Sequence, residues 1–157
     1  MLKIEIPGQR AFILEHLVLD YNGTMAIDGK QIPAVGDLLN QLENTLQVHI
    51  LTADTFGTAG PHLKAISCRL VVLHGGRQDV LKRKYIEKIG TGKTVCIGNG
   101  RNDLLMIKKA ALGIAVIQEE GAFVETVMKA DVVCRSIVDA LQLLINPQRL
   151  IATLRNG

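Results

Sequence analysis

The segment His16–Thr24, with the sequence HLVLDYNGT, is the stretch that best indicates the fold. Its apolar part, Leu17–Leu19, is typical of a strand that is covered on both faces. The strand ends at Asp20, and an Asn-Gly pair in the next four residues predicts a turn. Ligands of parallel α/β proteins bind beyond the carboxyl ends of the strands. Asp20 and the residues after it are therefore the first candidates for a functional site.

Apolar runs like this one recur along the chain and alternate with segments of helical period. The predicted strands are Glu15–Asp20, Val48–Thr52, Arg69–His74, Thr94–Ile97, Gly113–Ile117 and Asp131–Cys134. The predicted helices are Val35–Asn44, Gly60–Ile66, Asp79–Ile89, Asn102–Ala111, Ala122–Ala130 and Ile137–Leu144. The alternation predicts an α/β fold, a three-layer Rossmann-like arrangement in which helices cover both faces of a mostly parallel sheet.

Three further segments lie outside this alternation. Leu2–Ile6 alternates apolar and polar residues and is interpreted as an added edge strand. Met25–Ile32 is predicted to be a hairpin with its turn at Asp28-Gly29. The tail Gln148–Gly157 receives no assignment. Because there is no internal repeat or linker-like stretch, residues 1–157 are expected to form a single domain.

Composition excludes several classes of protein. Hydrophobic residues make up 48% of the 157 residues and charged residues 21%, which is typical of a globular chain. Aromatic residues are 3%, with no Trp, and the net charge is only +3, so a nucleic-acid partner is not expected. No apolar stretch reaches the roughly 18 residues of a membrane span, and the first residues do not resemble a signal peptide. A cytoplasmic protein without a membrane partner is expected.

Polar residues follow two other predicted strands. Thr52-Ala53 ends the second strand, and Gly98–Asp103, with the sequence GNGRND, follows the fourth. A Lys-rich helix that includes Lys82 precedes that fourth strand. Taken in order with His16–Thr24, these segments resemble the four motifs of the haloacid dehalogenase-like (HAD) superfamily of phosphatases and P-type ATPase catalytic domains. The resemblance covers nearly the whole chain.

The resemblance implies a Mg²⁺-dependent phosphohydrolase that acts on a phosphorylated substrate of unknown identity. Asp20 would be the nucleophile that forms an aspartyl-phosphate, and no cofactor other than Mg²⁺ would be needed. The implied catalytic residues are Asp20, Asn22, Thr52 and Lys82. The implied metal ligands are Asp20, Asn22 through its backbone carbonyl, Asn99 and Asp103. The implied phosphate-binding residues are Gly23, Thr24, Thr52, Ala53, Lys82 and Asn102.

Two residues depart from the family pattern. Asn22 stands where most family phosphatases have a second Asp that acts as general acid and base, and an amide cannot transfer that proton. Asn99 stands where an Asp usually contacts the metal, so two carboxylates, Asp20 and Asp103, remain at these motif positions. Turnover is therefore expected to be slow, since loss of a general acid typically lowers rates roughly 10²–10⁴-fold. The combination most resembles the soluble P-type ATPase-like group; the alternative is a catalytically impaired binding or regulatory protein of the same fold.

The intervals between the motifs are short, and several assignments stay open. Each interval holds little more than one helix and one strand, so no cap domain is expected. An open site implies either a large substrate or a neighbouring subunit that supplies a lid. Lys84 is an alternative to Lys82, and Asp54 is either a helix cap or a site residue. The four histidines and three cysteines form no ligand spacing and are expected to be structural.

Overall fold

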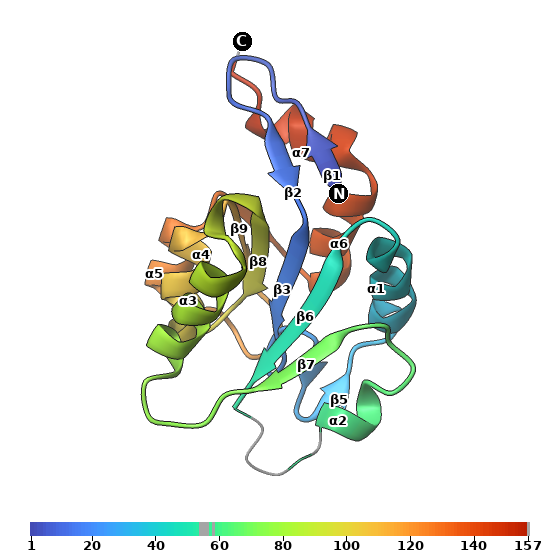
Figure 1. The fold of residues 1–157 in the computed structure, drawn as a ribbon, viewed down its shortest axis with the longest axis vertical. Helices are drawn as coiled ribbons and strands as arrows, with labels where there is room; N and C mark the ends of the chain where they lie inside the picture. The colour runs from blue at the N-terminus through green and yellow to red at the C-terminus, as the bar shows by residue number, and fades with distance from the viewer. Residues whose placement is uncertain (54–56, 58, 157) are drawn as a thin grey trace.

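The computed structural model describes residues 1–53, 57 and 59–156 (Figure 1). The strands are β1 (Leu2–Ile4), β2 (Phe12–Leu14), β3 (His16–Asp20), β4 (Ala26–Ile27), β5 (Lys30–Gln31), β6 (Gln47–Thr52), β7 (Arg69–Val72), β8 (Thr94–Gly98), β9 (Leu112–Val116) and β10 (Val132–Cys134). The helices are α1 (Val35–Glu43), α2 (Ala59–His62), α3 (Gln78–Ile89), α4 (Leu104–Lys109), α5 (Val124–Lys129), α6 (Ile137–Ile145) and α7 (Pro147–Leu154), with 3₁₀ turns η1 (Thr91–Lys93) and η2 (Arg101–Asp103). In the described part of the chain, no helix could cross a lipid bilayer.

Six parallel strands form the central sheet in the order β10-β9-β8-β3-β6-β7. The chain starts in the middle at β3, adds β6 and β7 on one side, and then returns to add β8, β9 and β10 on the other. The strand order therefore reverses between β3 and β8, where Leu19 pairs with Ile97. Ligands of such folds bind at this reversal, and Asp20 ends one of the two strands.

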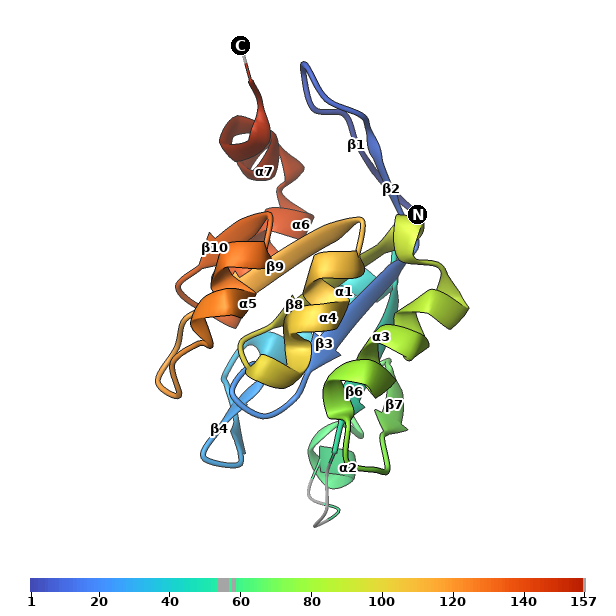
Figure 2. The ribbon, with the colours of Figure 1, turned by 90° about the vertical axis from the view of Figure 1, so that its left-hand side faces the viewer.

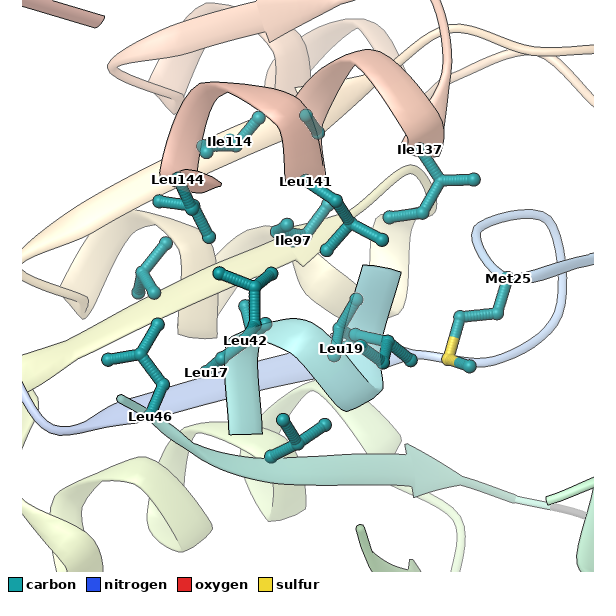
Figure 3. Packing of buried hydrophobic residues seen from close by; sticks show 14 of the residues in the cluster. Leu17, Leu19, Met25, Leu42, Leu46, Ile97, Ile114, Ile137, Leu141 and Leu144 are labelled. Carbon is teal, nitrogen blue, oxygen red and sulfur yellow. The ribbon is translucent and has the colours of Figure 1, made fainter. Parts of the chain in front are cut away.

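Helices cover both faces of this sheet. Helices α1 and α6 pack on one face, and α3, α4 and α5 lie on the other (Figures 1 and 2). On the first face, Leu42 of α1 and Leu141 and Leu144 of α6 point toward the strand residues Leu17 and Ile97 (Figure 3). All of these side chains are buried, and a smaller apolar cluster lies under α3 and α4. The three-layer α/β prediction is confirmed.

The predicted elements occur at nearly the expected places, with differences at their ends. All six predicted strands and all six helices of the alternation are present. The helix predicted at Gly60–Ile66 is instead the single turn Ala59–His62. The helix predicted at Asn102–Ala111 begins as the 3₁₀ turn Arg101–Asp103, because the Asp103 side chain accepts hydrogen bonds from backbone amides of the preceding loop.

The amino-terminal prediction is wrong in its pairing. β1 does not extend the central sheet but pairs with β2 in a separate antiparallel hairpin. β2 leads into β3 through the single residue Glu15, so the hairpin stays at the amino end of β3. β3 is a central strand, and the hairpin therefore does not pair with either edge strand of the sheet, β7 or β10. The unassigned tail forms α7, which lies beside this hairpin (Figure 2), and Gln9 donates a 2.7 Å hydrogen bond to the carbonyl of Leu154.

The hairpin predicted at Met25–Ile32 is confirmed. β4 and β5 pair antiparallel across Asp28 and Gly29, which have φ angles of 51° and 75°. Positive φ at both central residues is the signature of a type I′ turn, which requires residues such as Asp and Gly. The hairpin continues the loop that follows Asp20, so its turn bears on the candidate site.

Three polar side chains form a hydrogen-bonded chain at the other end of the sheet. His16 Nδ1 lies 3.1 Å from His49 Nε2, and His49 Nδ1 lies 2.9 Å from the Tyr85 hydroxyl of α3. Both histidines are buried. Burial lowers the pKa of His16, and burial together with the charges of His16 and Arg69 lowers the pKa of His49 to about 4. The two histidines thus link β3 and β6 to α3 through Tyr85, and their purely structural role stays a prediction.

We predict that His49 makes the fold sensitive to acid. Its pKa in the folded state lies below the ordinary value of 6.5, so the unfolded state binds the extra proton as the pH falls from about 6.5 toward 4. The free energy of unfolding should decrease over that window, and a His49→Gln variant should lose less stability over it. Urea unfolding of both proteins at pH 7, 6, 5 and 4 measures this; equal losses would contradict the assignment.

Candidate active site

The carboxyl ends of β3, β6 and β8 bring the sequence-predicted residues to one place. Asp20 ends β3 and pairs with Leu51 of β6, the residue before Thr52. On the other side, β8 ends at Gly98 and leads into the GNGRND segment. Adjacent strands lie about 4.8 Å apart, so residues that are separated by up to 83 positions in the sequence become neighbours.

A buried lysine joins the two carboxylates of this site. Lys82 Nζ lies 2.5 Å from Asp20 Oδ1 and 2.7 Å from Asp103 Oδ1. The exposed fractions of Lys82, Asp20 and Asp103 are 1%, 6% and 0%. A buried charge is tolerated only when it is paired, and here one ammonium is shared by two carboxylates. By contrast, Lys84 is exposed, so the geometry selects Lys82 from the two candidate lysines.

The charges in this group change one another's pKa. Burial and the Asp103 carboxylate raise the pKa of Asp20, whereas Lys82 and a backbone hydrogen bond from Tyr21 oppose the rise. Burial alone would lower the pKa of Lys82, but the two carboxylates outweigh it and its pKa is raised. The ammonium therefore stays charged and offsets one of the two carboxylate charges.

Asp103 also fixes the loop that follows β8. Its Oδ2 accepts hydrogen bonds from the backbone amides of Asn99 at 3.0 Å and Gly100 at 2.9 Å. Gly98 makes this possible, because a Cβ there would lie only 2.5 Å from Asp103 Cγ. Both Asp103 oxygens are thus engaged, and a direct contact with a metal stays a prediction for this residue.

Oxygen atoms suited to Mg²⁺ gather on the side of Asp20 away from Lys82. The Thr24 hydroxyl lies 3.4 Å from Asp20 Oδ2 and 3.3 Å from Asn99 Oδ1. The carboxylate oxygen and the amide oxygen are therefore both neighbours of the same hydroxyl. Asn99 is 8% exposed, and its Nδ2 donates to the Gly121 carbonyl at 3.0 Å, so Oδ1 faces the site. Carboxylate and amide oxygens are the hard ligands that Mg²⁺ prefers. The residues present therefore fit Mg²⁺, although no cluster of three or more His, Cys, Asp or Glu suited to a metal occurs among the described residues.

The loop after Asp20 is held by its own hydrogen bonds. The amide of Gly23 donates to the Ala26 carbonyl at 2.7 Å, and that of Thr24 donates to the Tyr21 carbonyl at 3.3 Å. Gly23 has a φ of 79°, and a Cβ there would lie 2.6 Å from Asn99 Nδ2. Phosphate binding by these two amides stays a prediction. It requires that the amides give up their backbone hydrogen bonds and donate to phosphate oxygens instead.

The other predicted residues lie around this centre. Thr52 is buried at the end of β6, whereas Ala53 and the side chain of Asn22 are exposed. Asn102 is half-buried in the turn η2. Asp54 lies outside the described residues. The roles assigned to Thr52, Ala53, Asn22 and Asn102 stay predictions.

The loop after β9 contributes residues that the sequence analysis missed. Gln118 Nε2 donates to the carbonyls of Gly23 and Thr24, both at 3.0 Å. Glu120 Oε1 accepts a hydrogen bond from the Asp28 amide at 3.2 Å, and its Oε2 lies 2.7 Å from the point that a Gly23 Cβ would occupy. These residues follow a predicted parallel strand, so inspection of the end of that strand, as for the others, would have found them.

Comparison with known proteins identifies relatives of this arrangement. No model of a known protein family matches the chain. An uncharacterized protein of Methanocaldococcus jannaschii is 44% identical over 85 residues, which are 52% of this chain and 91% of that protein.

Solved structures share the fold at low sequence identity. A protein of Legionella pneumophila assigned to the HAD superfamily hydrolases, subfamily III A, has a TM-score of 0.71 and 16% identity, covering 90% of this chain and 87% of that one. The 3-deoxy-D-manno-octulosonate 8-phosphate phosphatase of Moraxella catarrhalis, in complex with magnesium, phosphate and KDO, has a TM-score of 0.68 and 16% identity, covering 90% and 94%. The cobalt-bound deoxy-D-mannose-octulosonate 8-phosphate phosphatase of Haemophilus influenzae has a TM-score of 0.67 and 13% identity, covering 91% and 94%. The chain thus belongs to the same family as the uncharacterized Methanocaldococcus jannaschii protein, and its fold is that of the HAD superfamily.

Proposed function

We propose that this chain is a Mg²⁺-dependent phosphohydrolase that acts through an aspartyl-phosphate on Asp20. The observation that carries the proposal is the buried Lys82, which contacts both Asp20 and Asp103 where the strand order reverses. Such a group costs stability to bury and is not needed to close an apolar core. Solved phosphatases of the same fold support the same reading.

The first step is the attack of Asp20 on phosphorus. One oxygen of the Asp20 carboxylate, which Lys82 holds in place through Oδ1, forms the new bond to phosphorus as the ester oxygen departs with the bonding electron pair. Lys82 and the Thr52 hydroxyl offset the negative charge on the phosphoryl oxygens. Mg²⁺ held by Asp20, Asn99 and the Asn22 carbonyl would reduce the repulsion between the carboxylate and the phosphate.

The second step is the hydrolysis of the acyl phosphate. Water attacks phosphorus, the bond between phosphorus and the Asp20 carboxylate breaks, and inorganic phosphate leaves with Asp20 restored. In both steps a proton must move, to the departing oxygen and then from the attacking water. Asn22 has no acidic proton to supply, so solvent would perform both transfers and the rate would be low. A catalytically impaired binding protein is the second candidate, and the amides at positions 22 and 99 favour it.

We predict that Asp20→Asn abolishes phosphate release. An amide is a poor nucleophile, so Mg²⁺-dependent hydrolysis of p-nitrophenyl phosphate should fall on the order of 10³-fold or more. The matched control is Asp37→Asn on the exposed surface of α1, which should keep the wild-type rate. If wild-type and Asp20→Asn proteins show the same rate, the chain is not a phosphohydrolase of this kind and the binding-protein alternative gains support.

We predict that Asn22→Asp accelerates turnover. A carboxylic acid at this position can protonate the departing oxygen and then activate water, so kcat should rise roughly 10²-fold. Asn44→Asp, an equivalent change on the exposed end of α1, should have no effect. A gain of only a few-fold at position 22 would mean that missing proton transfer does not limit the rate.

We predict that Lys82 and Lys84 differ sharply in their effect on stability. Lys82→Met leaves two buried carboxylates without their shared cation and should lower the free energy of unfolding by about 3–5 kcal/mol. Lys84 is exposed, so Lys84→Met should change it by no more than about 0.5 kcal/mol. Urea unfolding at pH 7 compares the two variants. Similar losses of unfolding free energy would show that the contacts of Lys82 with Asp20 and Asp103 do not stabilise the fold.

A further inference from the structure

A surface hollow lies beside the candidate active site. Its volume is about 560 Å³, and its lining residues come from the two residues before α3, the start of α3 and η2: Gly76, Arg77, Gln78, Asp79, Arg101 and Asn102. We call it the arginine pocket. Gln78 lies one helical turn before Lys82, on the same face of α3. On the other side, Arg101 and Asn102 immediately precede Asp103, the second partner of Lys82.

Arg101 gives this pocket a positive charge that no carboxylate offsets. Its guanidinium carbon lies 5.6 Å from the centre of the Phe123 ring, a cation–π contact that restricts where the side chain points. Phe123 is tied to the site, because its amide donates a 2.8 Å hydrogen bond to the Asn99 carbonyl. No ion pair to Arg101 occurs among the described residues.

Arg77 also lines the pocket, and its side chain is 75% exposed. Its Nε and Nη2 donate to the two carboxylate oxygens of Asp79, both at 3.0 Å. This bidentate pair uses two of the five N–H donors of the guanidinium. The others can serve a ligand. Since Asp79 balances Arg77, Arg101 leaves the pocket with one positive charge in excess.

Gln78, a lining residue, is joined to the loop before α3 by its side chain. Its Nε2 donates to the carbonyls of Leu73 at 3.2 Å and Gly75 at 2.8 Å, which fixes the orientation of the amide. Its Oε1 is buried and has no hydrogen-bond partner among the described residues. Because Oε1 is inaccessible from the surface, Gln78 supports the lining through its Nε2 hydrogen bonds and is assigned no contact with a ligand.

We propose that the arginine pocket binds a second anionic group of the substrate. This inference rests on the proposed phosphohydrolase function and narrows its substrate class. The substrate is a small phosphate monoester that also bears a carboxylate or a second phosphate. Arg101 and Arg77 bind the second anion, and the ester phosphate lies at Asp20.

Two pairs of phosphate esters test this inference. 3-Phosphoglycerate and glycerol 3-phosphate share a carbon chain and a hydroxyl and differ in one carboxylate. Fructose 1,6-bisphosphate and fructose 6-phosphate differ in one phosphate. The two anionic groups of the bisphosphate are farther apart than those of 3-phosphoglycerate. We expect the wild-type kcat/KM to favour the doubly anionic member of at least one pair by about tenfold, as for a charge-assisted hydrogen bond. Arg101→Gln should reduce that ratio to near one.

The control is an arginine far from the pocket. Arg10 is exposed in the turn of the β1–β2 hairpin, at the opposite end of the molecule from Asp20, so Arg10→Gln should keep the preference. The inference is wrong if neither pair is discriminated, or if the Arg101→Gln protein discriminates as well as wild type.

A binding measurement separates this inference from the proposed function. Asp20→Asn protein with Mg²⁺ is titrated with the same four esters, and the shift of its melting temperature is recorded with and without Arg101→Gln. A larger shift for the doubly anionic esters that disappears with Arg101→Gln supports the pocket even if no ester is hydrolysed. Asp20-dependent hydrolysis without any such difference would support the phosphohydrolase and exclude the pocket.

Discussion

The ammonium of Lys82 lies within hydrogen-bond distance of two buried carboxylates, and the geometry of the candidate site depends on that contact. Without the cation, Asp20 and Asp103 would face each other in a region that excludes water, where like charges repel strongly. With it, Asp20 is held at the end of β3 and Asp103 is held against the loop after β8. One ion group thereby links the first strand of the sheet to the strand at which the order reverses.

The loops around this group are tied to one another by hydrogen bonds. Asp103 accepts the amides of the loop after β8, and Asn99 in that loop donates to Gly121. Gln118, in the same loop as Gly121, donates to the carbonyls of Gly23 and Thr24 in the loop after β3. The site is therefore a set of three loops that restrain one another. Such restraint is what preorganised charge stabilisation requires.

The two asparagines of the motifs lower the negative charge of the site. Asn99 still presents an oxygen beside Asp20, and Asn22 lies on the exposed side of the loop. An arrangement with two carboxylates and one lysine repels a phosphate dianion less than four carboxylates would. It also holds a cation less strongly. We therefore propose that this balance of charge favours the binding of metal and phosphate together over the binding of metal alone.

The sequence by itself determined the order of elements and the residues at the ends of β3, β6 and β8, because hydrophobic periodicity and strand-end chemistry are local properties. It did not determine that the amino-terminal strand pairs with Phe12–Leu14, nor that Lys82 rather than Lys84 enters the site. Pairing depends on which edges are accessible, and the choice of lysine depends on the rotation of α3 against the sheet. The roles of Gln118 and Glu120 likewise arise only when distant loops meet, since their hydrogen-bond partners lie over 90 residues away in the chain.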